Sequence, residues 1–238
     1  MIILKKKRLI IIAICLLMGC FAFSFQMGLQ DKVMPTVTLP VSSKVIVLDA
    51  GHGYPDNGAS SNSGITENEI NLKITQKVQE LLETSGATII LTRSDENGIY
   101  DLDKNTLREK KVSDIKNRVK IGNNAQADCF ISIHLNKIPQ SQYDGWQTFY
   151  KKGNQQGEEL AKSIQAGLNA SIQKQNNRQS LAISDKYIVE HVTIPLSIVE
   201  CGFLSNPEEE KQLQQDDYQN RLAWGIYTGI MDYFYSDR

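Results

Sequence analysis

Basic residues, cysteines and histidines are scarce in this 238-residue sequence once its first 27 residues are set aside. The remainder has 22 basic against 27 acidic residues, and this net charge of −5 excludes nucleic acid as an expected partner. Cys15 and Cys20 lie in the first segment, so only Cys129 and Cys201 remain, too few for a disulfide scaffold. Both lie in predicted strands, where we expect buried thiols, with a single bridge as the alternative. Internal repeats and low-complexity tracts are also missing.

The first 27 residues have the layout of a signal peptide or a short membrane anchor. Lys5–Arg8 is basic and precedes the apolar stretch Leu9–Phe25, which as a helix would measure roughly 25 Å, near the lower limit for crossing a bilayer. Cleavage stays open, as does lipidation at Cys20, and an internal core helix is the remaining alternative. We expect residues 28–43 to be a linker, and residues 44–238 to form one extracytoplasmic domain.

Apolar strand-like segments alternate with amphipathic ones along the rest of the chain. This order predicts an α/β fold: a twisted, mostly parallel or mixed sheet flanked by helices in a single catalytic domain. We expect strands at residues 44–49, 88–92, 128–135, 146–150, 186–189 and 196–201, and helices at residues 67–85, 114–124, 158–175 and 218–235.

Three of the predicted strands end in a reactive side chain. His52 follows the apolar run Val45–Leu48 between two glycines, His134 ends the strand at 128–135, and Glu200 ends the strand at 196–201. Ligands collect at the carboxyl ends of strands in open α/β sheets, so these side chains could converge. The chain has three histidines in all, and two of them lie at these strand ends.

A metal site built on His52 and His134 needs a third ligand, and we choose Glu67. Catalytic zinc sites use three protein ligands from His and carboxylate groups and leave one position open. Thr66 and Glu69 match a capping box that would start a helix at Glu67 and fix its carboxylate, while turning Glu69, the competing candidate, toward the backbone. Each residue also has a structural interpretation: a hydrogen-bonded histidine, an anion at a helix start, or half of a salt bridge.

The other candidates have weaker support. Ser132 and Ser197 lack the strand-turn-helix context of a nucleophilic serine, and Cys201 has no evident base. His191 lies between predicted strands and could contact a substrate or face solvent.

Six separated motifs resemble the zinc-dependent N-acetylmuramoyl-L-alanine amidases of bacterial cell walls. They are DAGHG, TENEINL, LTRSD, Arg118 with Asn123, ADCFISIHLN and IPLSIVECGFLSNPEE. The resemblance implies a Zn²⁺ ion held by His52, Glu67 and His134, and Glu200 as the catalytic carboxylate. It also implies peptidoglycan as the substrate, hydrolysed between the lactyl group of N-acetylmuramic acid and L-alanine. Asn136, Arg178 and His191 are the candidate substrate-binding residues.

A short chain with a membrane-type N-terminus most resembles the sporulation branch of this family, whose members act in spore cortex maturation and germination. That branch implies a location in the cell wall or the forespore intermembrane space. The chain departs from the family pattern at Ala50, in the longer charged stretch Asp101–Ser113 and at Gln179, which bear on the substrate rim. A partner protein that loads zinc or regulates the enzyme stays open. The alternatives are another zinc peptidoglycan hydrolase, a deacetylase or peptidase, and a non-catalytic wall-binding module.

Overall fold

The computed structural model describes residues 14, 16–19 and 38–236, and its compact unit begins at Leu39. Most of the expected signal or anchor at 1–27, and residues 28–37 of the expected linker, lie outside the described residues. None of the helices formed by the described residues has the length and apolar character that a bilayer crossing requires. The expected linker also ends earlier than residue 43, because Val41 is fully buried in the main core.

Within residues 38–236, six strands form one mixed sheet in the order β2-β1-β3-β6-β4-β5. Pairing is parallel throughout except between β4 and β6, which are antiparallel. The strands are β1 (Val45–Ala50), β2 (Thr88–Leu91), β3 (Cys129–Asn136), β4 (Gln147–Lys151), β5 (Leu181–Ile183) and β6 (Leu196–Phe203). This architecture confirms the predicted α/β fold with a single domain.

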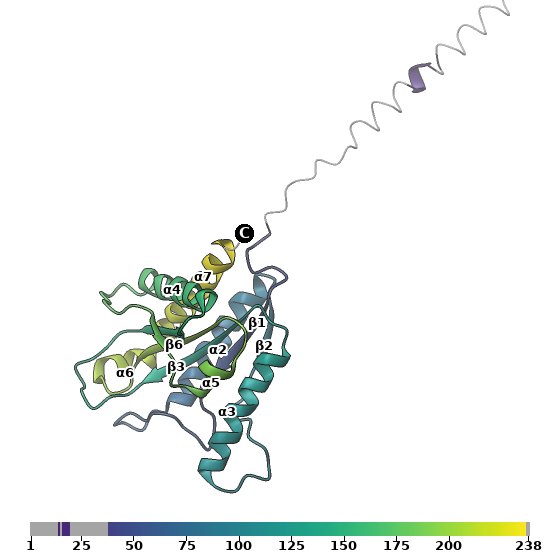
Figure 1. Ribbon diagram of the computed structural model, residues 1–238. Coiled ribbons are helices and arrows are strands. Elements are labelled where there is room, and N and C mark those ends of the chain that lie inside the picture. Colours follow the sequence, from purple (N-terminus) through teal and green to yellow (C-terminus); the bar gives the residue numbers. More distant parts are fainter. Residues whose placement is uncertain (1–13, 15, 20–37, 237–238) are drawn as a thin grey trace, which may run out of the picture. The chain divides into compact units, whose positions relative to one another are not determined.

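Helices cover both faces of this sheet, and each face has its own apolar cluster. The helices are α2 (Glu67–Thr84), α3 (Leu107–Asn124), α4 (Gln155–Ser171), α5 (Tyr187–His191), α6 (Pro207–Leu213) and α7 (Asp216–Ser236). Residues of α2, α4 and α7 form the larger cluster, and α4 lies beside α7 in Figure 1. Residues of α3 and α5 form the smaller cluster on the other face.

The central strands β1, β3 and β6 are apolar along nearly their whole length because both of their faces are covered. Ile46, Val47 and Leu48 have no exposed surface, and neither do Cys129 and Phe130 at the start of β3. A parallel sheet with helices on both sides requires such continuous apolar runs. The register pairs Ala50 with Ile133 and His134 with Glu200, so the polar ends of these strands lie at one edge of the sheet.

The predictions of two elements differ most from the structure, and two further elements were not predicted. The segment predicted as a strand at 186–189 is the short helix α5, because its apolar residues Ile188 and Val189 pack against the smaller cluster instead of pairing. Helix α3 begins seven residues before Asp114, at Leu107, where Thr106 and Glu109 form a capping box. Strand β5 and helix α6 were not predicted, since each is short and has little periodicity.

Candidate metal centre

His52 lies directly beyond strand β1 in a backbone conformation that few side chains adopt. Its φ is +61°, in the left-handed region, and the Gly53 that follows has φ +153°. Gly51 before it makes room for a second ring, because a Cβ at position 51 would lie 2.3 Å from the ring of His134. The glycine on the amino side of His52 therefore permits the two imidazoles to approach each other.

Glu67 is the first residue of α2, but a capping box does not hold it there. Within the described chain, Thr66 makes no side-chain cap hydrogen bond, and Glu69 is exposed. Instead the preceding loop folds back on the helix start: the N–H of Glu67 donates to the carbonyl of Ala59, and the N–H of Ala59 donates to Glu67 Oε2 at 2.8 Å. The prediction that a helix starts at Glu67 is confirmed, whereas the predicted cause, a capping box of Thr66 and Glu69, is wrong.

The side chains of His52, Glu67 and His134 meet at the carboxyl edge of the sheet. One ligand atom from each lies within 4.8 Å of the others. Glu67 Oε2 lies 3.3 Å from His52 Nε2 and Glu67 Oε1 lies 3.0 Å from His134 Nδ1, while the two rings stand edge to face with centroids 5.1 Å apart. Two imidazoles and one carboxylate are a donor set that suits zinc.

Electrostatics keep this carboxylate ionised. Burial alone would raise the pKa of Glu67, but its hydrogen bonds to His134 and His52 outweigh burial and lower the pKa well below the usual range. The N–H of Leu135 also donates to Glu67 Oε1, at 3.0 Å. Burial lowers the pKa of His52, yet Asp56 and Glu67 raise it to about 9. The ionised carboxylate of Glu67 therefore lies between the rings of His52 and His134.

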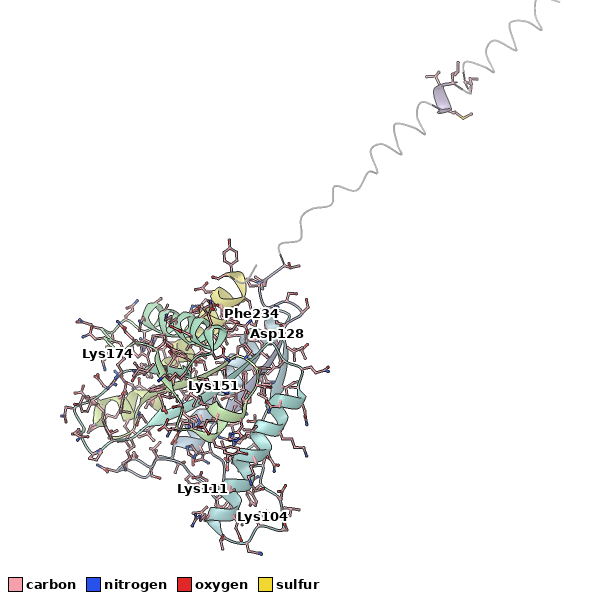
Figure 2. All side chains as sticks on the ribbon, viewed as in Figure 1. Lys104, Lys111, Asp128, Lys151, Lys174 and Phe234 are labelled. Carbon is pink, nitrogen blue, oxygen red and sulfur yellow. The ribbon has the colours of Figure 1, made fainter. Side chains whose placement is uncertain are left out.

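Asp56 is a functional candidate that the sequence analysis missed. Its Oδ2 lies 2.9 Å from His52 Nδ1, the ring nitrogen on the far side from Glu67, and its Oδ1 accepts from Lys111 Nζ at 2.8 Å. Lys111 lies on α3. In Figure 2, Lys111 lies toward the opposite end of the compact unit from Asp128, the residue before β3. A carboxylate on the second nitrogen of a histidine orients the ring toward a metal. Because both residues lie in an irregular loop, their spacing in the sequence gave no signal of this contact.

Glu200 lies beside this cluster on strand β6, paired with His134 on one side and Gln147 on the other. Its Oε2 is buried and has no hydrogen-bond partner among the described residues. Burial raises the pKa of Glu200 above its ordinary value. The arrangement provides a carboxyl group that can hold or release a proton next to the three donors.

The three proposed substrate-binding residues lie in different places. Arg178 donates from Nη1 to Gln147 Oε1 at 3.3 Å, and Gln147 is the register partner of Glu200 on β6. The guanidinium of Arg178 also lies over the ring of Phe203. Asn136 ends β3, two residues beyond His134, and is partly buried. His191 is exposed and lies shortly before β6 in the chain. Its backbone carbonyl accepts a hydrogen bond from the side chain of Asn123, at the end of α3. The structure therefore does not bring His191 to the cluster.

Both cysteines of the domain are buried, free thiols, as predicted. Burial raises the pKa of Cys129 and of Cys201 far above the ordinary range, so neither forms a thiolate near neutral pH. Ser132 donates to Asp49 inside the core, and Ser197 is fully buried. These groups are structural.

Comparison with known proteins identifies the family. The family model of N-acetylmuramoyl-L-alanine amidase matches residues 46–232. The germination-specific N-acetylmuramoyl-L-alanine amidase of Bacillus subtilis (strain 168) is 34% identical over 230 residues, which cover 97% of this chain and 96% of that protein. The CwlD amidase from Clostridioides difficile, solved in complex with the GerS lipoprotein, is 45% identical with a TM-score of 0.80, covering 82% of this chain and 100% of that one.

A second solved structure, an N-acetylmuramoyl-L-alanine amidase from Clostridium difficile 630, is 26% identical with a TM-score of 0.72 and covers 83% of this chain and 100% of that one. The similarity in fold and sequence therefore extends over nearly the whole compact unit. This chain belongs to the N-acetylmuramoyl-L-alanine amidase family.

Proposed function

We propose that this amidase uses zinc held by His52, Glu67 and His134, and that it acts on spore cortex peptidoglycan in preparation for germination. The observation that carries the proposal is the convergence of two imidazoles and one ionised carboxylate within 4.8 Å, from three separate segments. The germination role rests on the similarity, over nearly full length, to the germination-specific amidase of Bacillus subtilis.

The three side chains fit a metal better than they fit a purely structural cluster. Glu67 is 3% exposed, and each of its oxygens faces one imidazole nitrogen while also accepting a backbone N–H. Its geometry is therefore fixed before any ion arrives, which favours metal binding. When bound, a zinc ion would supply Lewis acidity, making water a better nucleophile and stabilising negative charge.

In the proposed reaction Glu200 moves the proton. Water attacks the lactyl carbonyl carbon, the C–N bond to L-alanine breaks, and Glu200 takes the proton from water and returns it to the departing amine. Such general acid-base catalysis typically contributes about 10² to 10⁴-fold. The raised pKa of Glu200 suits this role, because a stronger base accepts the proton more readily. Oε2 can accept that proton, because it has no hydrogen-bond partner in the part of the chain that the structure describes.

We propose that Arg178 and Asn136 contact the substrate beside this centre. The guanidinium of Arg178 lies over the ring of Phe203 and donates to Gln147, which is the register partner of Glu200 in the sheet. A guanidinium is suited to bind a carboxylate, which the peptide of peptidoglycan provides. Asn136 offers amide groups at the end of β3.

Delivery outside the cytoplasm and a protein partner complete the proposal. Residues 1–27 would direct or anchor the chain, because a basic cluster followed by about 17 apolar residues is typical of export segments. The CwlD amidase was solved with a lipoprotein. By analogy we propose that a lipoprotein also binds this chain.

The test measures zinc and product together. Full-length protein is purified, its zinc is quantified, and cortex peptidoglycan digested by it is analysed by mass spectrometry. We expect close to one zinc per chain and new lactyl acid and L-alanine amine ends. His134→Ala should lose both the zinc and the product. Equal zinc in the two proteins would overturn the metal site, and free glucosamine amines would indicate a deacetylase instead.

A further inference from the structure

Two buried arginines bind the backbone that carries His52. Arg93 Nε donates to the carbonyl of Ala50 at 2.8 Å, and Arg93 Nη2 donates to that of Gly51 at 3.1 Å. Arg118 donates to the carbonyls of Ala50 and His52. Three successive carbonyls between the end of β1 and His52 therefore accept from guanidinium groups.

Arg93 also reaches the segment that carries Glu67. Its Nη2 donates to the carbonyl of Asn68 at 2.8 Å, in the first turn of α2, and its Nη1 donates to the carbonyl of Asp95 at 2.7 Å. One planar group therefore joins the loop of His52 to the helix start of Glu67. The guanidinium of Arg93 therefore constrains the distance between these two backbone segments.

Burying the cations of Arg93 and Arg118 costs free energy of folding, so a role at the site would account for their presence. Arg93 is 3% exposed and Arg118 is 2% exposed. Burying a cation destabilises the folded state when its interactions are incomplete, and apolar residues of similar size often stabilise a core better. Arg118 has the carboxylates of Asp49 and Asp114 as partners, whereas among the described residues Arg93 donates four hydrogen bonds, all to backbone carbonyls. Burial and the nearby Arg118 lower the pKa of Arg93 only to about 10, so it stays charged near neutral pH.

The backbone held in this way is the one that needs support. His52 has a positive φ, a strained conformation that persists where surrounding contacts impose it. Asn71 adds a second link between the same segments, because its Nδ2 donates to the carbonyl of Gly51 at 3.1 Å and to Glu67 Oε1 at 3.3 Å. Both bridges end on the segments of His52 and Glu67.

We propose that Arg93 is a positioning residue that sets the separation of His52 and Glu67 and thereby the affinity and geometry of the metal centre. The inference rests on the proposed function, since it takes these two residues as metal ligands. The planar fork is essential to it: a lysine at position 93 would keep the charge, but a single ammonium cannot hold carbonyls of three segments in one plane.

The experiment compares Arg93→Lys and Arg93→Gln with a control variant of the full-length protein. Arg93→Lys could fail to fold, because it can leave a buried charge with too few partners. Arg93→Gln is included as a second variant because its side chain is neutral. The control is Ile164→Ala, a cavity variant on α4 that destabilises the larger apolar cluster and removes no hydrogen bond of Arg93. For each protein we measure the melting temperature without metal, zinc affinity by competition with a chromophoric chelator, and the visible absorption spectrum of the cobalt-substituted form.

Both Arg93 variants should bind zinc about 10 to 100-fold more weakly than wild type, the range typical of lost outer-shell contacts. The cobalt spectrum should change in intensity and position. Ile164→Ala should lower the melting temperature and leave affinity and spectrum unchanged. Wild-type affinity and spectrum in a folded Arg93 variant would overturn the positioning role, and so would an equal loss of affinity in Ile164→Ala. A wild-type protein that binds no zinc would instead overturn the proposed metal site.

Discussion

Glu67 and Glu200 are two glutamates at the same edge of the sheet, in opposite surroundings. Glu67 accepts hydrogen bonds from the N–H groups of Ala59 and Leu135 and faces an imidazole with each oxygen. Glu200 Oε2 is buried and, among the described residues, has no partner at all. Burial acts to raise the pKa of both, but donors outweigh it only at Glu67, whose pKa is lowered while that of Glu200 is raised.

The difference follows from where each residue lies in the fold. Glu67 begins a helix beside the end of β3, and its carboxylate accepts one N–H from the preceding loop, that of Ala59, and one from β3, that of Leu135. Glu200 lies within a strand between β3 and β4, where neighbouring backbone groups pair with each other. The fold therefore fixes one carboxylate as a permanent anion and leaves the other able to exchange a proton. These environments suit a metal ligand and a catalytic base, respectively.

Among the variants that test this comparison, Glu67→Gln should have the largest effect, on both zinc content and amide cleavage. A neutral amide is a poor zinc ligand, and its NH₂ group would face the N–H of Ala59 or of Leu135, or an imidazole nitrogen. Zinc and amide cleavage should both fall to background, measured by elemental analysis and by mass spectrometry of muropeptides. Glu69→Gln, an exposed change two residues along the same helix, is the matched control and should retain both. Retention of zinc by Glu67→Gln would break the assignment of Glu67 as a ligand.

Glu200→Gln should separate chemistry from metal binding. The amide keeps the size of the side chain but cannot act as a base, so cleavage should fall by at least about 10² while zinc content stays at the wild-type level. Thermal stability should not decrease, because no hydrogen bond to Oε2 is lost. Loss of zinc in this variant, together with its retention in Glu67→Gln, would mean that ligand and base are exchanged.

The sequence predicted those parts of the molecule that depend on local patterns. Buried strands such as Val45–Ala50 are continuous apolar runs, and the rule that parallel strands share a carboxyl edge was enough to bring His52, His134 and Glu200 together. The segment 186–189 was misread because a short apolar run is compatible with a strand or a helix, and only packing against the smaller cluster decides between them.

The supporting contacts of the site could not be predicted, because they join residues distant in sequence. Arg93 and Arg118 belonged to motifs noted in the sequence, but only the folded chain shows their side chains on the carbonyls beside His52. Thr66 satisfied the capping pattern, yet the backbone of Ala59 took the place of its side chain. Asp56 was overlooked because its loop has no regular periodicity.

Asp56→Asn should weaken metal binding without abolishing it. Asp56 Oδ2 contacts the nitrogen of His52 that faces away from Glu67, so the change affects ring orientation and basicity instead of removing a ligand. Zinc affinity measured by chelator competition should fall about 10 to 100-fold. Lys111→Met is the control: it removes an exposed partner of Asp56 and should change the affinity much less. A larger loss from Lys111→Met than from Asp56→Asn would contradict this role of Asp56.

The last prediction concerns the stability of the fold at Glu209, a buried glutamate that extends the comparison beyond the site. It is 1% exposed, and its carboxylate accepts from the N–H groups of Gly145 and Phe203. Burial outweighs these donors and raises the pKa of Glu209 from 4.5 to about 7. Between these values the folded chain retains a proton that the unfolded chain releases, so rising pH favours unfolding through this group.

The free energy of unfolding of the wild type should therefore fall relative to Glu209→Gln as pH rises from about 4.5 to 7, by at most about 3 kcal/mol, and the difference should level off above pH 7. Urea unfolding at a series of pH values measures this difference, and comparing slopes removes the constant cost of placing an amide at position 209. Parallel pH profiles of the two proteins would show that the two N–H donors keep Glu209 ionised. Glu209 would then resemble Glu67, and burial without such donors would be what distinguishes Glu200.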